Sequence, residues 1–250
     1  MRLALVFVIM FFAGSAIADP LCGRENMAAF YGALVQSRSD GRPVKIHIVG
    51  DSKAAGQGVS SEYTLQSLLT EASNGYPVQV TATGYSAQNS EYWLKVGVTE
   101  FLRSHADVDL LVVNFGTNEK VAALLQSDED IAKNHTAALS IIRREKSANE
   151  LSVLFLGQPP ANNHLDEFKQ TTETMRGVNA ILKNGAKHTN SAYFDTLALF
   201  SRAHSEAGWM DNAPVPTIGS ANIHPGAAMN MVLIGELARG LFPIPFKARN

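Results

Sequence analysis

Short apolar runs alternate with segments of helical length through most of the chain. Five runs are rich in Val, Ile, Leu or aromatic residues, as buried strands are: 44–50, 77–84, 109–116, 151–157 and 191–197. The clearest helical segment is 128–146, where Ile131, His135, Ala138, Leu139 and Ile142 share one face. This alternation predicts an α/β fold, in which right-handed crossovers build a five-stranded parallel sheet covered on both faces by helices.

A helical stripe precedes the first of these strands. It consists of Met27, Phe30, Tyr31, Leu34 and Val35, and the polar stretch "QSRSDGRP" that follows is expected to end the helix. After this helix, no internal repeat, low-complexity stretch or linker interrupts the alternation of strands and helices. Residues 19–250 are therefore expected to form a single domain.

The first 18 residues differ in kind from the rest. Arg2 supplies a positive charge, residues 3–12 are apolar, and Ala16 and Ala18 are the small residues that a signal peptidase requires. The apolar run is too short to span a bilayer comfortably as a permanent anchor. We expect residues 1–18 to be a signal peptide, and the mature protein to be periplasmic or secreted, free of the membrane once it is cleaved.

Composition excludes several classes of partner and cofactor. The chain of 250 residues is 46% hydrophobic with a formal net charge of −2, and its Lys and Arg residues are scattered, so no nucleic-acid partner is expected. Cys22 is the only cysteine, which excludes an intrachain disulfide. Apart from His224, the histidines lack metal-ligand spacing and are interpreted as surface or satisfied core residues, so no metal or other cofactor is expected.

Four residue types with related chemistry follow the predicted strands. In open parallel sheets the ligand crevice forms beyond the carboxyl ends of the strands, so Ser52, Gly84, Asn118 and His224 are expected at one edge. A serine hydroxyl is a nucleophile once a base such as His224 takes its proton. The backbone N–H groups of Ser52 and Gly84 and the side-chain amide of Asn118 suit an oxyanion hole.

These positions resemble the motifs of the SGNH hydrolases, also called GDSL esterases and lipases. The similarity rests on "GDS" at 50–52, Gly84, "GTNE" at 116–119 in place of the usual G-T-N-D, and "IHPGAA" at 223–228, in family order. It spans nearly the whole mature chain. It implies a flavodoxin-like three-layer α/β/α sandwich, ester hydrolysis through an acyl-serine at Ser52 with His224 as base, and no metal.

One position departs from the family pattern. The family carries Asp three residues before its histidine, and here that residue is Ala221. A buried carboxylate at this position orients the imidazole and stabilises its cation. Three alternatives follow: a backbone carbonyl orients His224, a side chain such as Asn222 or Asp211 replaces the carboxylate, or the site does not hydrolyse esters. Asp51 is expected to order the turn at Ser52 rather than to be the missing acid.

Export and short loops favour small acyl groups on an exposed carrier, such as O-acetyl groups on a polysaccharide or on peptidoglycan. Four aromatic residues follow the first two strands and either stack on a sugar or pack between helix and sheet: Tyr63, Tyr85, Tyr92 and Trp93. The function predicted first is an exported serine esterase. The alternatives are an O-acyltransferase that uses the same acyl-serine and a carbohydrate-binding pseudoenzyme, the latter favoured by Ala221.

Overall fold

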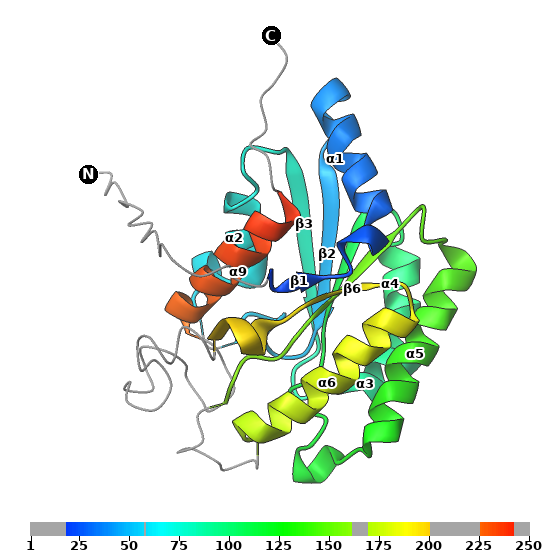
Figure 1. The fold of residues 1–250 in the computed structure, drawn as a ribbon, viewed down its shortest axis with the longest axis vertical. Coiled ribbons are helices and arrows are strands. Elements are labelled where there is room, and N and C mark those ends of the chain that lie inside the picture. Colours follow the sequence, from blue (N-terminus) through cyan, green and yellow to red (C-terminus); the bar gives the residue numbers. More distant parts are fainter. Residues whose placement is uncertain (1–18, 58, 162–169, 201–225, 243–250) are drawn as a thin grey trace.

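The protein is described here from a computed structural model that covers residues 19–57, 59–161, 170–200 and 226–242 (Figure 1). Its centre is a six-stranded sheet of strand order β1-β6-β5-β4-β2-β3. The strands are β1 (Leu21–Cys22), β2 (Val44–Gly50), β3 (Val78–Gly84), β4 (Leu110–Asn114), β5 (Ser152–Leu156) and β6 (Ala192–Phe194). Strands β2 to β6 are parallel, and β1 pairs antiparallel with β6.

All five predicted strands are present, with ends that shift by no more than three residues. The prediction of a purely five-stranded parallel sheet was wrong by one strand, because Leu21 and Cys22 add a short antiparallel edge beside Phe194 and Tyr193. Two residues carry no detectable alternation of polar and apolar positions. Only their backbone pairing with β6 makes them a strand.

The parallel strands follow the flavodoxin-like order. If the parallel strands are numbered 1 to 5 along the chain, beginning with β2, their order across the sheet is 2-1-3-4-5. The chain therefore leaves β2 for β3 on one side and then crosses to β4 on the other. This reversal is the topological switch point, where open α/β sheets form their ligand crevice.

Helices cover both faces of the sheet (Figure 1). One face packs against α1 (Ala28–Asp40), α2 (Leu65–Glu71) and α9 (Ala227–Leu241). The other packs against α4 (Val98–Ser104), α5 (Asp128–Glu145) and α6 (Thr172–His188). A short helix, α3 (Ser90–Tyr92), and a π-helical turn, η3 (Trp93–Gly97), lead directly into α4. Three one-turn 3₁₀ helices, η1 (Arg24–Asn26), η2 (Ser61–Tyr63) and η4 (Ala122–Leu124), lie in connecting segments.

Alternation along the central strands divides the core into two layers. In β4, Leu110 and Val112 pack with α1, α2 and α9, whereas Leu111 and Val113 pack with the helices of the opposite face. All four side chains are buried. A strand buried on both faces shows a continuous apolar run, which is why the sequence identified β4 without any polar alternation.

The predicted helices are confirmed, with one boundary corrected. Helix α5 buries the predicted stripe from Ile131 to Ile142. Ser127 caps its N-terminus, because the Ser127 side chain accepts a hydrogen bond from the Asp130 N–H. Helix α1, by contrast, continues through most of the polar stretch expected to end it. It stops at Gly41, which adopts the left-handed conformation (φ 76°), and it leaves Val35 exposed.

Several sequence predictions lie outside the described residues. They are the signal peptide at 1–18 and the segment that contains Asp211, Ala221, Asn222 and His224. Beyond the segment that contains His224, the chain forms α9, which runs from Ala227 to Leu241.

Candidate active site

Ser52 lies in the turn that leaves the carboxyl end of β2. The last residue of this strand, Gly50, pairs with Gly84 of β3 on one side and with Asn114 of β4 on the other. The ends of the three strands are thus level, at the switch point of the sheet. Ser52 itself is 4% exposed, and its carbonyl accepts a hydrogen bond from the Gln57 N–H at 3.0 Å, which closes the turn.

Asp51 joins this turn to the loop that follows β4. Its Oδ1 accepts the Lys53 N–H at 3.1 Å, and its Oδ2 accepts the Thr117 N–H at 3.3 Å. The prediction that Asp51 orders the turn through backbone N–H groups is therefore confirmed. Through this carboxylate the turn that carries Ser52 and the loop that carries Asn118 are held together.

Lys53 is a buried cation that sequence reasoning missed. Its Nζ lies 2.8 and 2.9 Å from the two carboxylate oxygens of Asp51, and both side chains are at most 5% exposed. Burial lowers the pKa of Lys53, while the Asp51 carboxylate opposes that shift. The only indication in the sequence is that Lys53 directly follows Ser52 within a stretch of small residues. Such a lysine could equally well be exposed to solvent, so the sequence does not predict that it is buried.

Gly84 packs against the nucleophile turn. A Cβ atom at this position would lie 2.1 Å from the Ala55 nitrogen and 2.4 Å from its Cα. Only glycine therefore permits the end of β3 to approach the turn this closely. The structure thus gives Gly84 a packing reason in addition to its predicted place at the oxyanion hole.

Asn118 lies in the loop after β4, and its amide is held in place from both ends. Its Nδ2 donates to the Gln88 carbonyl at 2.9 Å, and its Oδ1 accepts from Gln170 Nε2 at 3.5 Å. An amide nitrogen carries two hydrogens, so one N–H remains beyond the bond to Gln88. Asn118 is 6% exposed, which suits a donor set in a largely dry site.

Two buried glutamines support this loop, and no motif marks the role of Gln170 in the sequence. Gln158 Oε1 accepts from Thr117 Oγ1 at 2.8 Å, and Gln158 Nε2 donates to the Phe115 carbonyl at 2.9 Å. Gln170 Nε2 donates to the Thr117 carbonyl at 2.8 Å. These bonds satisfy loop backbone and side-chain groups that would otherwise be buried without partners.

Glu119, where the family pattern has Asp, is fully buried behind the site. Its Oε1 accepts the Ser90 N–H at 2.9 Å and its Oε2 accepts the Ser90 hydroxyl at 3.0 Å. Burial raises the pKa of Glu119 to about 7; the hydrogen bonds from Ser90 act against this shift. Through these bonds Glu119 ties the loop after β4 to the start of α3.

The remaining predicted site residues, His224, Asn222 and Asp211, lie outside the described residues, so the structure does not place them beside Ser52. Trp93 is fully buried and stacks on Phe115 at a centroid distance of 5.8 Å, which supports packing rather than sugar stacking for this residue. Within the part of the chain that the structure describes, no group of three or more His, Cys, Asp or Glu side chains is arranged to hold a metal ion.

The strand order, together with a serine, a glycine and an asparagine at the ends of β2, β3 and after β4, defines an α/β/α hydrolase of the SGNH type. A comparison with protein families agrees. The chain belongs to the GDSL-like lipase/acylhydrolase family, whose pattern matches residues 48–232. Its class is therefore that of the ester hydrolases. No curated protein sequence matches the chain.

Solved structures of esterases share the fold. A carbohydrate acetylesterase from Sinorhizobium meliloti is 17% identical with a TM-score of 0.60, covering 78% of this chain and 96% of that one. An aryl esterase from M. smegmatis is 18% identical with a TM-score of 0.59, covering 78% and 97%. A two-domain esterase active on acetylated mannans is 14% identical with a TM-score of 0.66, covering 90% of this chain and 57% of that one.

Proposed function

We propose that the protein is an exported serine esterase that removes small acyl groups, O-acetyl groups above all, from a carbohydrate. The observation that carries this proposal is the placement of Ser52, Gly84 and Asn118 at neighbouring strand ends. The carboxylate of Asp51 links the turn of Ser52 to the loop of Asn118. The similarity of the fold to acetylesterases supports the acetyl group as the acyl part.

In the proposed reaction, the Ser52 oxygen attacks the ester carbonyl carbon while its proton passes to His224. The negative charge that forms on the carbonyl oxygen is stabilised by the N–H groups of Ser52 and Gly84 and by the amide of Asn118. The carbon–oxygen bond to the sugar then breaks, and the sugar oxygen takes the proton from His224. Water attacks the acyl-serine in the same manner and releases the acid.

Hydrolysis of p-nitrophenyl acetate tests this proposal. Ser52→Ala and His224→Ala are expected to abolish the rate, and Asn118→Ala to lower it by about 10²–10³-fold, since one oxyanion donor is lost. Gln36→Ala, an exposed change on α1, is the matched control and keeps the wild-type rate. A wild-type rate in Ser52→Ala would contradict the proposed nucleophile.

Ala221 favours a second candidate, a carbohydrate-binding pseudoenzyme that lacks the carboxylate behind its histidine. The same assay separates the two. A serine-dependent rate in the wild type supports the esterase. An inactive wild type combined with an active Ala221→Asp variant supports the pseudoenzyme.

A further inference from the structure

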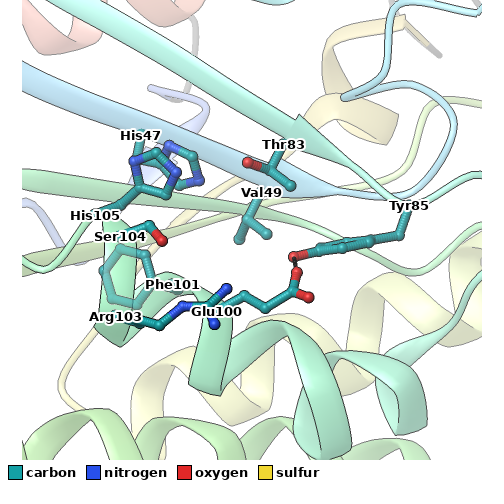
Figure 2. A pocket seen from close by; sticks show the side chains of 9 residues that line it. All are labelled: His47, Val49, Thr83, Tyr85, Glu100, Phe101, Arg103, Ser104 and His105. Atoms are coloured by element: carbon teal, nitrogen blue, oxygen red, sulfur yellow. Dashed lines mark hydrogen bonds between the residues drawn. The ribbon is translucent and has the colours of Figure 1, made fainter.

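A polar cavity of about 210 Å³ lies between strands β2 and β3 and helix α4 (Figure 2). At roughly 30 Å³ per water, this volume holds about seven water molecules. Val49, Thr83 and Tyr85 line one end of the cavity, near the carboxyl ends of β2 and β3. Tyr85 directly follows Gly84, so the cavity begins beside the edge of the sheet that carries Ser52.

The lining offers both hydrogen-bond donors and acceptors. The Tyr85 hydroxyl donates to Glu100 Oε2 at 2.5 Å, which leaves the other carboxylate oxygen of Glu100 as an acceptor. Arg103 is exposed and forms no ion pair with any other residue that the structure describes. The hydroxyls of Thr83 and Ser104 are able both to donate and to accept.

The opposite end of the cavity is closed by stacked rings. His47 and His105 lie parallel, with centroids 3.9 Å apart and an interplanar angle of 15°, and the His47 ring also stacks on Phe101. Burial, together with the neighbouring His105, lowers the pKa of His47 to about 3, so this ring is neutral at ordinary pH. His47 and Phe101 are almost fully buried, so the half-buried His105 ring presents the flat surface at this end.

The helix that forms the other wall contains a π-helical turn at Trp93–Gly97. Such a turn adds one residue and rotates the helix that follows by about 100°. A Cβ atom at Gly97 would lie 2.6 Å from the Trp93 ring, so glycine allows the Trp93 side chain to pack on this turn. Glu100 lies in the first turn of α4, directly after this π-helical turn, and meets the Tyr85 hydroxyl there. Single π-helical turns are frequent at functional sites.

We propose that this cavity binds one neutral sugar unit of the carbohydrate that carries the ester. The inference rests on the proposed function. An anion in this cavity would meet the Glu100 carboxylate, and a cation would meet Arg103. Sugar hydroxyls, which both donate and accept, match the mixed lining, and the C–H face of the ring packs on the half-buried rings of Tyr85 and His105. The unit recognised here is distinct from the acylated unit at Ser52.

Calorimetric titration of the full chain with neutral oligosaccharides tests this proposal. The probes are mannotetraose, xylotetraose and tetra-N-acetylchitotetraose, and the Ser52→Ala background prevents any covalent reaction. At least one probe is expected to bind. Arg103→Met is expected to weaken that binding roughly tenfold, because a charged hydrogen bond is lost, and Thr83→Val by a smaller factor.

Arg144→Met is the matched control, because Arg144 is an exposed arginine on α5, away from the cavity, and its loss leaves binding unchanged. The proposal is overturned if no neutral probe binds, or if binding ignores both Arg103→Met and Thr83→Val. It is also overturned if only glucuronate or inorganic phosphate binds in an Arg103-dependent manner, because the site then recognises anions.

Failure of this inference is distinguishable from failure of the proposed function. Hydrolysis of p-nitrophenyl acetate by the wild type reports on Ser52 with a substrate that contains no sugar. A serine-dependent rate without sugar binding would overturn the sugar site alone. Sugar binding without that rate would support the cavity and contradict the esterase.

Discussion

At the scale of single residues, Ser52 lies among buried charged side chains. Asp51 and Lys53 flank Ser52 and pair with each other, and Glu119 lies behind Asn118. Removing charges from water is costly unless they are paired and hydrogen-bonded, and here both conditions are met for Asp51 and Lys53. The pair therefore holds the turn in one conformation, and loss of either partner leaves a buried charge uncompensated.

The first prediction concerns the Lys53 cation. We expect Lys53→Met to lower the free energy of unfolding by roughly 3–5 kcal/mol, because Asp51 then lies buried without its counter-charge. Urea unfolding measures this change. Lys95→Met, which removes an exposed lysine paired with Glu91, is the control and costs at most about 1 kcal/mol. Equal effects of the two variants would refute the structural role of Lys53.

The second prediction concerns the pH dependence of stability at Glu119. Its pKa rises from 4.5 to about 7 on folding, so the folded state binds the proton more tightly than the unfolded state. The contribution of this proton to the free energy of unfolding is therefore complete below pH 4.5 and is lost as the pH rises through 7. Relative to Glu119→Gln, which has no such proton, the wild type should lose roughly 3 kcal/mol of unfolding free energy between about pH 4 and about pH 9.

Urea titrations of the wild type and Glu119→Gln at several pH values measure this difference. Taking the difference removes the contribution of all other titrating groups that the two proteins share. Two stability curves that stay parallel across this range would show that Glu119 keeps its ordinary pKa on folding.

At the scale of elements, the ends of three neighbouring strands set the geometry of the site. Gly50, Gly84 and Asn114 lie level with one another, and the turn and loop that follow β2 and β4 meet through Asp51. The close approach of β3 to the nucleophile turn depends on the absence of a side chain at Gly84. The position of Ser52 is therefore determined by packing between elements as well as by its own turn.

The third prediction follows from this contact. Gly84→Ala places a Cβ atom 2.1 Å from the Ala55 nitrogen, which is backbone and has to move. We expect kcat/KM for p-nitrophenyl acetate to fall by about 10²-fold, since a displacement of this size misplaces the nucleophile. The measurement is steady-state kinetics, with folding checked by circular dichroism.

Gly177→Ala on α6 is the control for this change. A Cβ atom there meets nothing within 4 Å, so activity is retained, and stability rises by up to about 1 kcal/mol because alanine favours a helix. Full activity of Gly84→Ala would show that the turn tolerates the displacement and that the close packing has no catalytic consequence.

At the scale of the whole molecule, two helical layers enclose a sheet whose strand order reverses at the proposed site (Figure 1). The first described residue, Asp19, is tied to the fold, because its Oδ1 accepts the Leu21 N–H at 3.0 Å and its Oδ2 pairs with Arg24 at 2.6 Å. Among the described residues, no helix has the length and apolar character needed to cross a bilayer.

The fourth prediction concerns processing of the N-terminus. If residues 1–18 act as a signal peptide, the protein recovered outside the cytoplasm should begin at Asp19, as mass spectrometry would show. Ala18→Leu is expected to block cleavage, because the peptidase requires a small residue there, whereas Ala4→Leu in the apolar run leaves cleavage intact. Recovery of an exported wild type that still begins at Met1 would contradict a cleaved signal.

The sequence by itself determined the alternation of strands and helices, the five parallel strands and the family motifs at the strand ends. These features are local: apolar runs, helical periodicity and short motifs depend on residues close together in the chain. Even the ends of β2 and the buried face of α5 follow from such patterns. The sequence also identified Asp51 as an organiser of its turn, since aspartate binds nearby backbone N–H groups.

Only the tertiary structure decided which distant groups meet. The antiparallel strand β1, the pairing of Lys53 with Asp51, the support of Asn118 by Gln88 and Gln170, and the cavity between β3 and α4 all join segments, or bury side chains, in ways that no local pattern encodes. Burial decides whether a lysine is solvated or paired, and whether a histidine such as His47 is charged. Asp51 is only two residues from Lys53, but the burial of both side chains, like that of His47, depends on segments far apart in the sequence that only the folded chain brings together.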